Sequence, residues 1–218
     1  MSFDPGLLWQ YAPLMLSGLW TTLVVCAAAI VIAILLGLVL ALGLLGRSRV
    51  VAAAARAYVE TMRGTPVLVL LFLLYYGGPS LGLLLDPVPA GIVGLGLYGA
   101  GYFAEIFRAG FASIPEGQVE AARLVGLTER QIVRRIKLPQ MLALILPPGI
   151  GQVIILVKES ALLSTITVAE LTKNATQMAN ETFAVIEPFL LVALLYWGLV
   201  ELIAQIGQTL ERRVGWLN

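Results

Sequence analysis

The chain has 218 residues, of which 59% are hydrophobic and 12% are charged, and its formal net charge at pH 7 is +1. The charged fraction is about half that of an ordinary soluble domain, so the composition excludes a water-soluble globular protein and predicts one all-α integral membrane domain over residues 1–218. The chain contains no histidine and one cysteine, Cys26, which excludes an internal disulfide and argues against both metal binding and histidine-dependent catalysis.

The first apolar segment is expected to be a retained membrane helix rather than a signal peptide. The residues from Met1 to Pro5 include no basic residue, and the apolar run over 23–45 is longer than the core of a signal peptide. Because a bilayer core of about 30 Å requires about 20 helical residues, the first span is expected within residues 14–45. Trp9 is expected at the outer membrane interface.

Four further apolar segments complete a prediction of five membrane helices. They cover residues 57–76, 89–109, 141–157 and 188–206. The third span is crowded with glycines, which predict close helix packing within the chain or between two copies.

The positions of the basic residues predict the orientation of these helices. Basic residues in short loops stay in the cytoplasm. Of the 14 basic residues, those in the first and third loops and after the last span would share one side of the membrane: Arg47, Arg49, Arg56, Arg108, Arg123, Arg130, Arg134, Arg135, Lys137, Arg212 and Arg213. The N-terminus is therefore expected outside, and the C-terminus and the loop between helices 3 and 4 in the cytoplasm.

Two pairs of opposite charges lie in the second and third spans. Glu60 and Arg63 are three residues apart, as are Glu105 and Arg108, so each pair shares a helical face. We expect each pair to bind one another or an adjacent helix. Contact between Arg63 and a substrate is the alternative interpretation.

The cytoplasmic loop predicts two short helices. Ser113 and Glu116 have the spacing of a capping box, and Thr128 and Gln131 repeat it. Between them, Gly126 can adopt the left-handed conformation that ends a helix. Such a pair of helices is either a solvated loop or a rigid surface for a partner protein.

The residues of this loop carry a family resemblance. Glu120-Ala121-Ala122 is followed after three residues by Gly126, and after nine more by Ile136-Lys137-Leu138-Pro139. This pattern resembles the signature of the membrane subunits of binding-protein-dependent ABC importers, where the loop docks on the ATP-hydrolysing subunit. The resemblance implies coupling roles for Glu120, Ala121, Ala122, Gly126, Ile136, Leu138 and Pro139.

Other segments resemble the polar amino acid group of that family. They are residues 63–68, residues 102–108 with the following 113–118, and residues 158–164. The last of these departs from the group, which more often has Asp at its second position and Ser at its fourth. The particular amino acid is therefore left open.

The resemblance implies a complete importer in the bacterial cytoplasmic membrane, working by alternating access. Its partners would be an ABC ATPase dimer, a second permease subunit (a second copy or a paralogue), an extracytoplasmic solute-binding protein and membrane lipid, with no nucleic acid. Because the sequence contains no P-loop, ATP and Mg²⁺ are expected on the ATPase, and this chain is expected to bind no cofactor or metal and to be no enzyme. The alternatives are another small polar cargo, or a non-transporting membrane assembly or sensor subunit.

The fourth span is expected to contribute to the substrate path. Pro139 disfavours helix at the residue before it and marks the start of this span, and the sequence over 147–151 predicts a break or kink. Transporters place charged groups near such breaks, and a zwitterionic amino acid needs both an anionic and a cationic contact. The candidate path residues are Lys158, Glu159, Ser160, Ser164, Gln152 and Arg63. Alternatively, Lys158 and Glu159 only mark the outer interface.

A short amphipathic helix is expected between the fourth and fifth spans. Thr167 and Glu170 have capping-box spacing, and Leu171, Ala175 and Met178 then share one face up to about residue 180. This segment is too polar to span the membrane. We expect an outer-face helix that could contact a binding protein.

Overall fold

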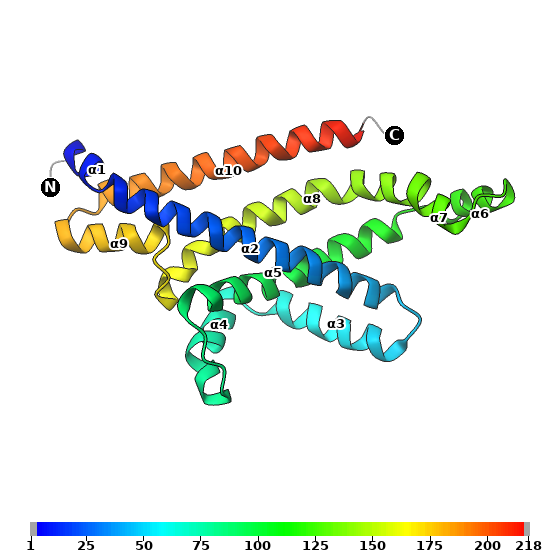
Figure 1. Ribbon diagram of the computed structural model, residues 1–218, viewed down its shortest axis with the longest axis horizontal. Coiled ribbons are helices and arrows are strands. Elements are labelled where there is room, and N and C mark those ends of the chain that lie inside the picture. The colour runs from blue at the N-terminus through cyan, green and yellow to red at the C-terminus, as the bar shows by residue number, and fades with distance from the viewer. Residues whose placement is uncertain (1–3, 216–218) are drawn as a thin grey trace.

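Four long helices form the body of the protein. The computed structural model describes residues 4–215, which contain helices and no strand. The long helices run along a common direction (Figure 1) and are α2 (Ala12–Leu45), α5 (Pro87–Ala112), α8 (Leu138–Glu159) and α10 (Ile186–Gly215). Within the described residues, four helices are long and apolar enough to cross a membrane, or five if a bent pair counts as one span. The all-α membrane fold is thus confirmed.

The second span is a bent pair rather than the straight helix expected over 57–76. Its first half, α3 (Arg49–Gly64), meets the second half, Val67–Leu81, at an angle of 105°. The second half consists of α4 (Val67–Phe72), a π-helical turn and a 3₁₀ turn, and it bends away from the bundle (Figure 1). Thr65 causes the bend, because a residue before proline avoids helical torsion angles, and Thr65 is extended.

The fourth span lacks the break that was expected in it. Helix α8 is continuous through Pro147 and Pro148. It begins at Leu138, so Pro139 lies at its start as expected, but Leu138 is helical although Pro139 was expected to disfavour helix there. A π-helical turn over Val133–Lys137 precedes Pro139, and its wider backbone relieves the clash between a proline ring and the preceding turn. Membrane helices tolerate such prolines where neighbouring helices and local backbone adjustments compensate for the lost hydrogen bonds.

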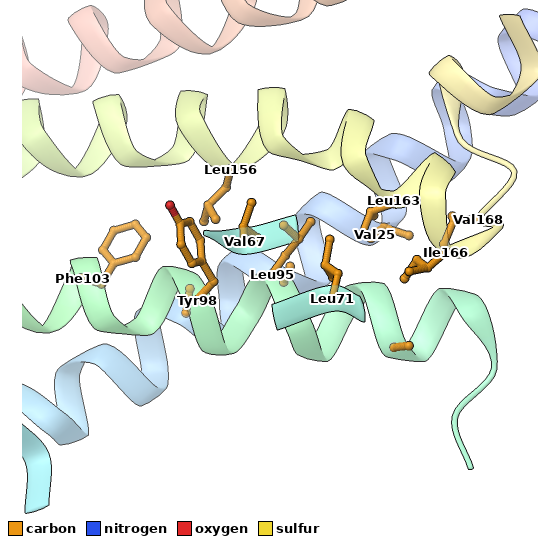
Figure 2. Packing of buried hydrophobic residues seen from close by; sticks show 13 residues of the cluster. Val25, Val67, Leu71, Leu95, Tyr98, Phe103, Leu156, Leu163, Ile166 and Val168 are labelled. Atoms are coloured by element: carbon orange, nitrogen blue, oxygen red, sulfur yellow. The ribbon is translucent and has the colours of Figure 1, made fainter. Parts of the chain in front are cut away.

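The core lies where α2, α5, α8 and the bent span meet. Val25, Val67, Leu71, Leu95 and Leu156 are among its buried side chains (Figure 2). The glycines of α5 allow this closeness: a Cβ on Gly99 would lie 2.8 Å from Leu156 Cδ1 and 2.9 Å from Ala33 Cβ. The glycine-rich third span therefore packs within the chain, as one of the two expected alternatives. The lone cysteine is buried in α2 as a small packed residue.

Replacing Gly37 with valine is expected to destabilise the α2–α5 packing by roughly 2 kcal/mol or more, because overpacking forces backbones apart. A Cβ on Gly37 would lie 2.6 Å from Phe103 Cβ and 3.1 Å from the backbone nitrogen of Ala104. The measurement is the temperature at which half of the detergent-solubilised protein remains monodisperse. Gly151→Ala is the control, since a Cβ there meets nothing within 4 Å. Equal midpoints for the two variants would contradict the expected close approach.

The two ends of the bundle carry different short helices. At one end, with the C-terminus, lie α6 (Glu116–Leu124) and α7 (Glu129–Ile132). At the other end, with the N-terminus, lie α1 (Pro5–Gln10) and α9 (Leu171–Thr182), as Figure 1 shows. The amphipathic helix expected after the fourth span is therefore present as α9. Its N-cap is Glu170 alone, because Thr167 adopts a left-handed conformation instead of joining a capping box.

Candidate functional site

The loop between α5 and α8 folds as a compact unit with its own small core. Val119, Ala122 and Ile132 are buried against one another, and Ile114, Leu127 and Ile136 pack around them. The residues of the family pattern thus differ in burial: Ala122 and Ile136 belong to this core and its surroundings, whereas Glu120 and Ala121 are exposed. Leu138 and Pro139 lie where this unit continues into α8.

A glycine-dependent turn ends α6. Gly126 has a φ of 80°, its N–H donates to Arg123 O at 3.0 Å, and the Leu127 N–H donates to Ala122 O at 3.0 Å. These two bonds form a Schellman motif, which satisfies the last carbonyls of the helix. Gly126 therefore ends α6, as its position in the sequence predicts.

The predicted caps of the two helices have different outcomes. Thr128 and Gln131 form the expected capping box at the start of α7. The capping box expected at Ser113 and Glu116 is wrong, because the Ser113 hydroxyl donates to Gly110 O at the end of α5 and Pro115 occupies the N-cap of α6. A serine hydroxyl between two helices can donate to a carbonyl at the end of the first or accept from an N–H at the start of the second. The sequence spacing of Ser113 and Glu116 does not distinguish these two hydrogen bonds.

An ion pair links the two helices on either side of the turn. Arg123 Nε lies 2.7 Å from Glu129 Oε1, joining the end of α6 to the start of α7. At the tip of the turn, Leu124 is 88% exposed and Val125 is 77% exposed. Sequence reasoning missed these two apolar residues, because nothing in their local sequence distinguishes an exposed pair from a buried one.

A row of polar side chains crosses the bundle at membrane depth. Tyr98 and Tyr102 lie one turn apart on α5, and their hydroxyl oxygens are 3.2 Å apart. The guanidinium carbon of Arg63, at the end of α3, lies 5.7 Å from the centre of the Tyr102 ring. On α8, Glu159 lies about one turn beyond Leu156, and Leu156 packs against α5 at Gly99, next to Tyr98. The row therefore runs from a cation on α3 through two tyrosines to an anion on α8.

The two tyrosines were not predicted as site residues. Figure 2 shows the Tyr98 ring rising from α5 toward α8, beside Leu156. Their only sequence signal is two tyrosines four residues apart within an apolar, glycine-rich span. Among the described residues Arg63 forms no ion pair with Glu60 and contacts the adjacent helix instead, whereas the pair between Glu105 and Arg108 is confirmed at 2.8 Å.

Gln152 lies buried on the same side of α8. Its helical neighbours Gly149 and Leu156 face Phe103 and Gly99 of α5, which places Gln152 at the α5–α8 interface. The amide nitrogen of Gln152 is one of two buried side-chain polar atoms in the described part of the chain that lack a hydrogen-bond partner. Buried polar groups usually have a partner, so this amide is an exception among the buried side chains of the described residues.

The remaining path candidates do not join this row. Lys158 is exposed at the end of α8. The Ser160 side chain is fully buried, and its hydroxyl donates to Val157 O at 2.7 Å. Ser164 similarly donates to Ala161 O at 2.7 Å. The structure therefore brings Arg63 and Glu159 into one row with the tyrosines and leaves the two serines in local hydrogen bonds.

Comparison with known proteins gives consistent matches over nearly the whole chain. Residues 33–216 match the family described as "binding-protein-dependent transport system inner membrane component". A probable amino-acid ABC transporter permease of Bacillus subtilis, YckA, is 33% identical, covering 97% of this chain and 93% of its own length. The arginine transport system permease ArtQ of the same organism is 34% identical, covering 93% of each chain. A crystal structure of an amino acid ABC transporter with histidines matches with a TM-score of 0.90 at 35% identity, covering 98% of this chain and 100% of the other.

Proposed function

The chain belongs to the family of binding-protein-dependent transport system inner membrane components, and we propose that it forms part of the path by which an ATP-driven importer moves polar amino acids. Members of this family are membrane subunits of the bacterial inner membrane. The observation that carries the cargo assignment is the row from Arg63 to Glu159. A zwitterionic amino acid carries one anionic and one cationic group, and the row has a complementary charge at each end.

The row would hold the cargo through its two ends. Arg63 would bind the carboxylate of the amino acid, and Glu159 would accept hydrogen bonds from its ammonium group. Ionisable residues at membrane depth are costly unless they face a partner or a watery cavity, which supports a transport role for both. Lys158 at the rim and the free amide of Gln152 would add polar contacts along the path. Ser160 and Ser164 would stay outside the cargo contacts, because their hydroxyls donate to local carbonyls.

The loop at the other end would couple the chain to a separate ATPase. Leu124 and Val125 form an exposed apolar tip, and Glu120 and Ala121 lie exposed beside it on α6. Because the Schellman turn and the small core make the loop rigid, force applied at the tip would reach α5 and α8 with little loss. ATP and Mg²⁺ would bind to the ATPase dimer, and this chain would act without a cofactor.

Alternating access then requires two such membrane subunits. Together with a second copy or a paralogue, the chain would enclose the row between the two subunits. ATP binding below would draw the coupling loops together, and the path would open toward a loaded binding protein on the outer side. The N-terminus would lie outside and the C-terminus in the cytoplasm, as the distribution of arginines favours.

The test begins with purification of the tagged chain from its native membranes in mild detergent, followed by mass spectrometry of the proteins that accompany it. An ABC ATPase should co-purify, and Leu124→Asp with Val125→Asp should remove it. Val50→Asp is the matched control, because Val50 is an equally exposed valine outside the loop. The purified complex, reconstituted in proteoliposomes with its binding protein, should take up labelled polar amino acids when ATP is supplied. Absence of an ATPase from the wild-type preparation, or uptake of sugars rather than amino acids, would contradict the proposal.

A further inference from the structure

Glu170 is a buried carboxylate at the start of α9. Its side chain is fully buried, and no cation forms an ion pair with it among residues 4–213. Its oxygens accept hydrogen bonds from the backbone N–H groups of Thr172 at 2.8 Å and Lys173 at 2.7 Å. Burial raises the pKa of the Glu170 carboxyl, although these hydrogen bonds act in the opposite direction. A buried acid in a short polar helix demands an explanation beyond helix capping, since an exposed Ser or Asp would cap as well.

Tyr196 joins this carboxylate to the end of α8. The Tyr196 hydroxyl, from α10, lies 3.2 Å from Glu170 Oε2 and 3.2 Å from Ser160 Oγ. An ionised carboxylate only accepts, so Tyr196 donates its single proton to Glu170. Ser160 is then the donor toward Tyr196 whenever its hydroxyl turns away from Val157 O. The three side chains thus form a short polar chain. At one end of it, the Ser160 hydroxyl has two alternative acceptors, Val157 O and the Tyr196 oxygen.

The two ends of this polar chain, Ser160 and Glu170, lie in parts of the protein that have different proposed roles. Ser160 directly follows Lys158 and Glu159, which the proposed function assigns to the cargo path. Glu170 caps α9, and α9 is held on α2 by the bond from Asn174 Nδ2 to Leu14 O at 2.8 Å. Helix α9 lies at the end of the bundle opposite α6 and α7 (Figure 1), where a binding protein would dock. The polar chain is therefore a direct link from the docking end to the cargo residues.

We propose that Tyr196 is a positioning residue that transmits the docking of a loaded binding protein on α9 to the segment carrying Lys158 and Glu159. This inference rests on the proposed function. A displacement of α9 moves Glu170, because the carboxylate is bound to the first turn of that helix. Tyr196 follows its acceptor, and the Ser160 hydroxyl turns from Val157 O toward the Tyr196 oxygen. The end of α8 then adjusts around Glu159, so cargo release and ATP hydrolysis are coupled to docking.

Tyr196→Phe separates this role from simple packing, because it removes the hydroxyl and leaves both backbone bonds to Glu170 in place. The assembled transporter is reconstituted in proteoliposomes, and its ATPase rate is measured with and without cargo-loaded binding protein. The unstimulated rate should stay within about twofold of wild type, whereas stimulation by the loaded binding protein should fall about tenfold. Tyr58→Phe is the matched control, since the Tyr58 hydroxyl also bridges two elements, from α3 to Leu97 O at 2.8 Å. Unchanged stimulation, or equal loss of both rates, would overturn the proposal.

A double-mutant cycle tests the link to Ser160. Ser160→Ala should reduce stimulation, and combining it with Tyr196→Phe should add little, because both changes break the same chain. Tyr58→Phe combined with Tyr196→Phe should be additive. Additive losses for the first pair would overturn the proposal. A wild-type complex that shows no stimulation by any loaded binding protein would instead contradict the proposed function, on which this inference rests.

Discussion

Replacing Glu159 with glutamine is expected to lower amino acid uptake about a hundredfold while the transporter stays assembled. Glutamine keeps the size of the side chain but cannot offer a charge to the ammonium group of the cargo. Truncating one partner of a desolvated, hydrogen-bonded charge pair typically costs roughly 2–5 kcal/mol, which corresponds to about 30-fold or more. The measurement is ATP-dependent uptake of labelled amino acids by proteoliposomes containing the purified complex.

Two controls accompany this variant. Asp86→Asn alters an exposed carboxylate directly before α5 that makes no cap hydrogen bond, and uptake should remain at the wild-type rate. Arg63→Gln should reduce uptake as Glu159→Gln does, because it removes the opposite end of the row. Wild-type uptake by both Glu159→Gln and Arg63→Gln would show that the cargo takes another route. Loss of the ATPase from either complex would indicate a folding defect instead.

Replacing Gly126 with valine is expected to uncouple the ATPase from transport, with uptake reduced about tenfold. The left-handed conformation costs an L-residue roughly 1–2 kcal/mol, and more when the side chain is β-branched. A Cβ at this position would meet nothing within 4 Å, so the defect would come from the backbone alone. Without the turn, the tip at Leu124 and Val125 would lose its orientation relative to α7.

The backbone origin of this effect can be tested with a second substitution. Asparagine tolerates the left-handed conformation, so Gly126→Asn should retain most of the uptake and the co-purifying ATPase. If asparagine and valine were equally harmful, the side chain rather than the turn would be responsible, and a direct ATPase contact at this position would be the better explanation.

Some features of the loop between α5 and α8 depend on local interactions and were predicted from the sequence, whereas others depend on packing. Gly126 ends α6 and Thr128 caps α7 with Gln131, as their spacing predicts, because both effects act within a few residues. Ser113 was assigned to the wrong helix, since a hydroxyl between two helices can bond to either. The exposure of Leu124 and Val125 follows only from the way α6 and α7 pack on their shared core.

The membrane spans likewise have some features that follow from composition and others that only packing decides. Their helical nature followed from composition, because a bilayer demands long apolar helices with every backbone group satisfied, and the five expected spans correspond to four long helices and one bent pair. The place of the break did not follow, although both candidate sites contain proline. At Thr65 and Pro66 the chain bends by 105°, whereas α8 passes through Pro147 and Pro148 while packed between α5 and α10. A proline permits a bend, and the neighbouring helices decide whether it occurs.

The sequence by itself therefore determined the membrane class, the helical nature of the spans, the short helices of the loop between α5 and α8 with their turn at Gly126, and the family. These features depend on composition and on interactions among residues close along the chain. The tertiary structure decided that Arg63 meets Tyr102 and that Glu170 is buried against Tyr196. These contacts join residues 39 and 26 positions apart in sequence (102 − 63 and 196 − 170), so only the packing of α3 on α5 and of α9 on α10 could bring them together.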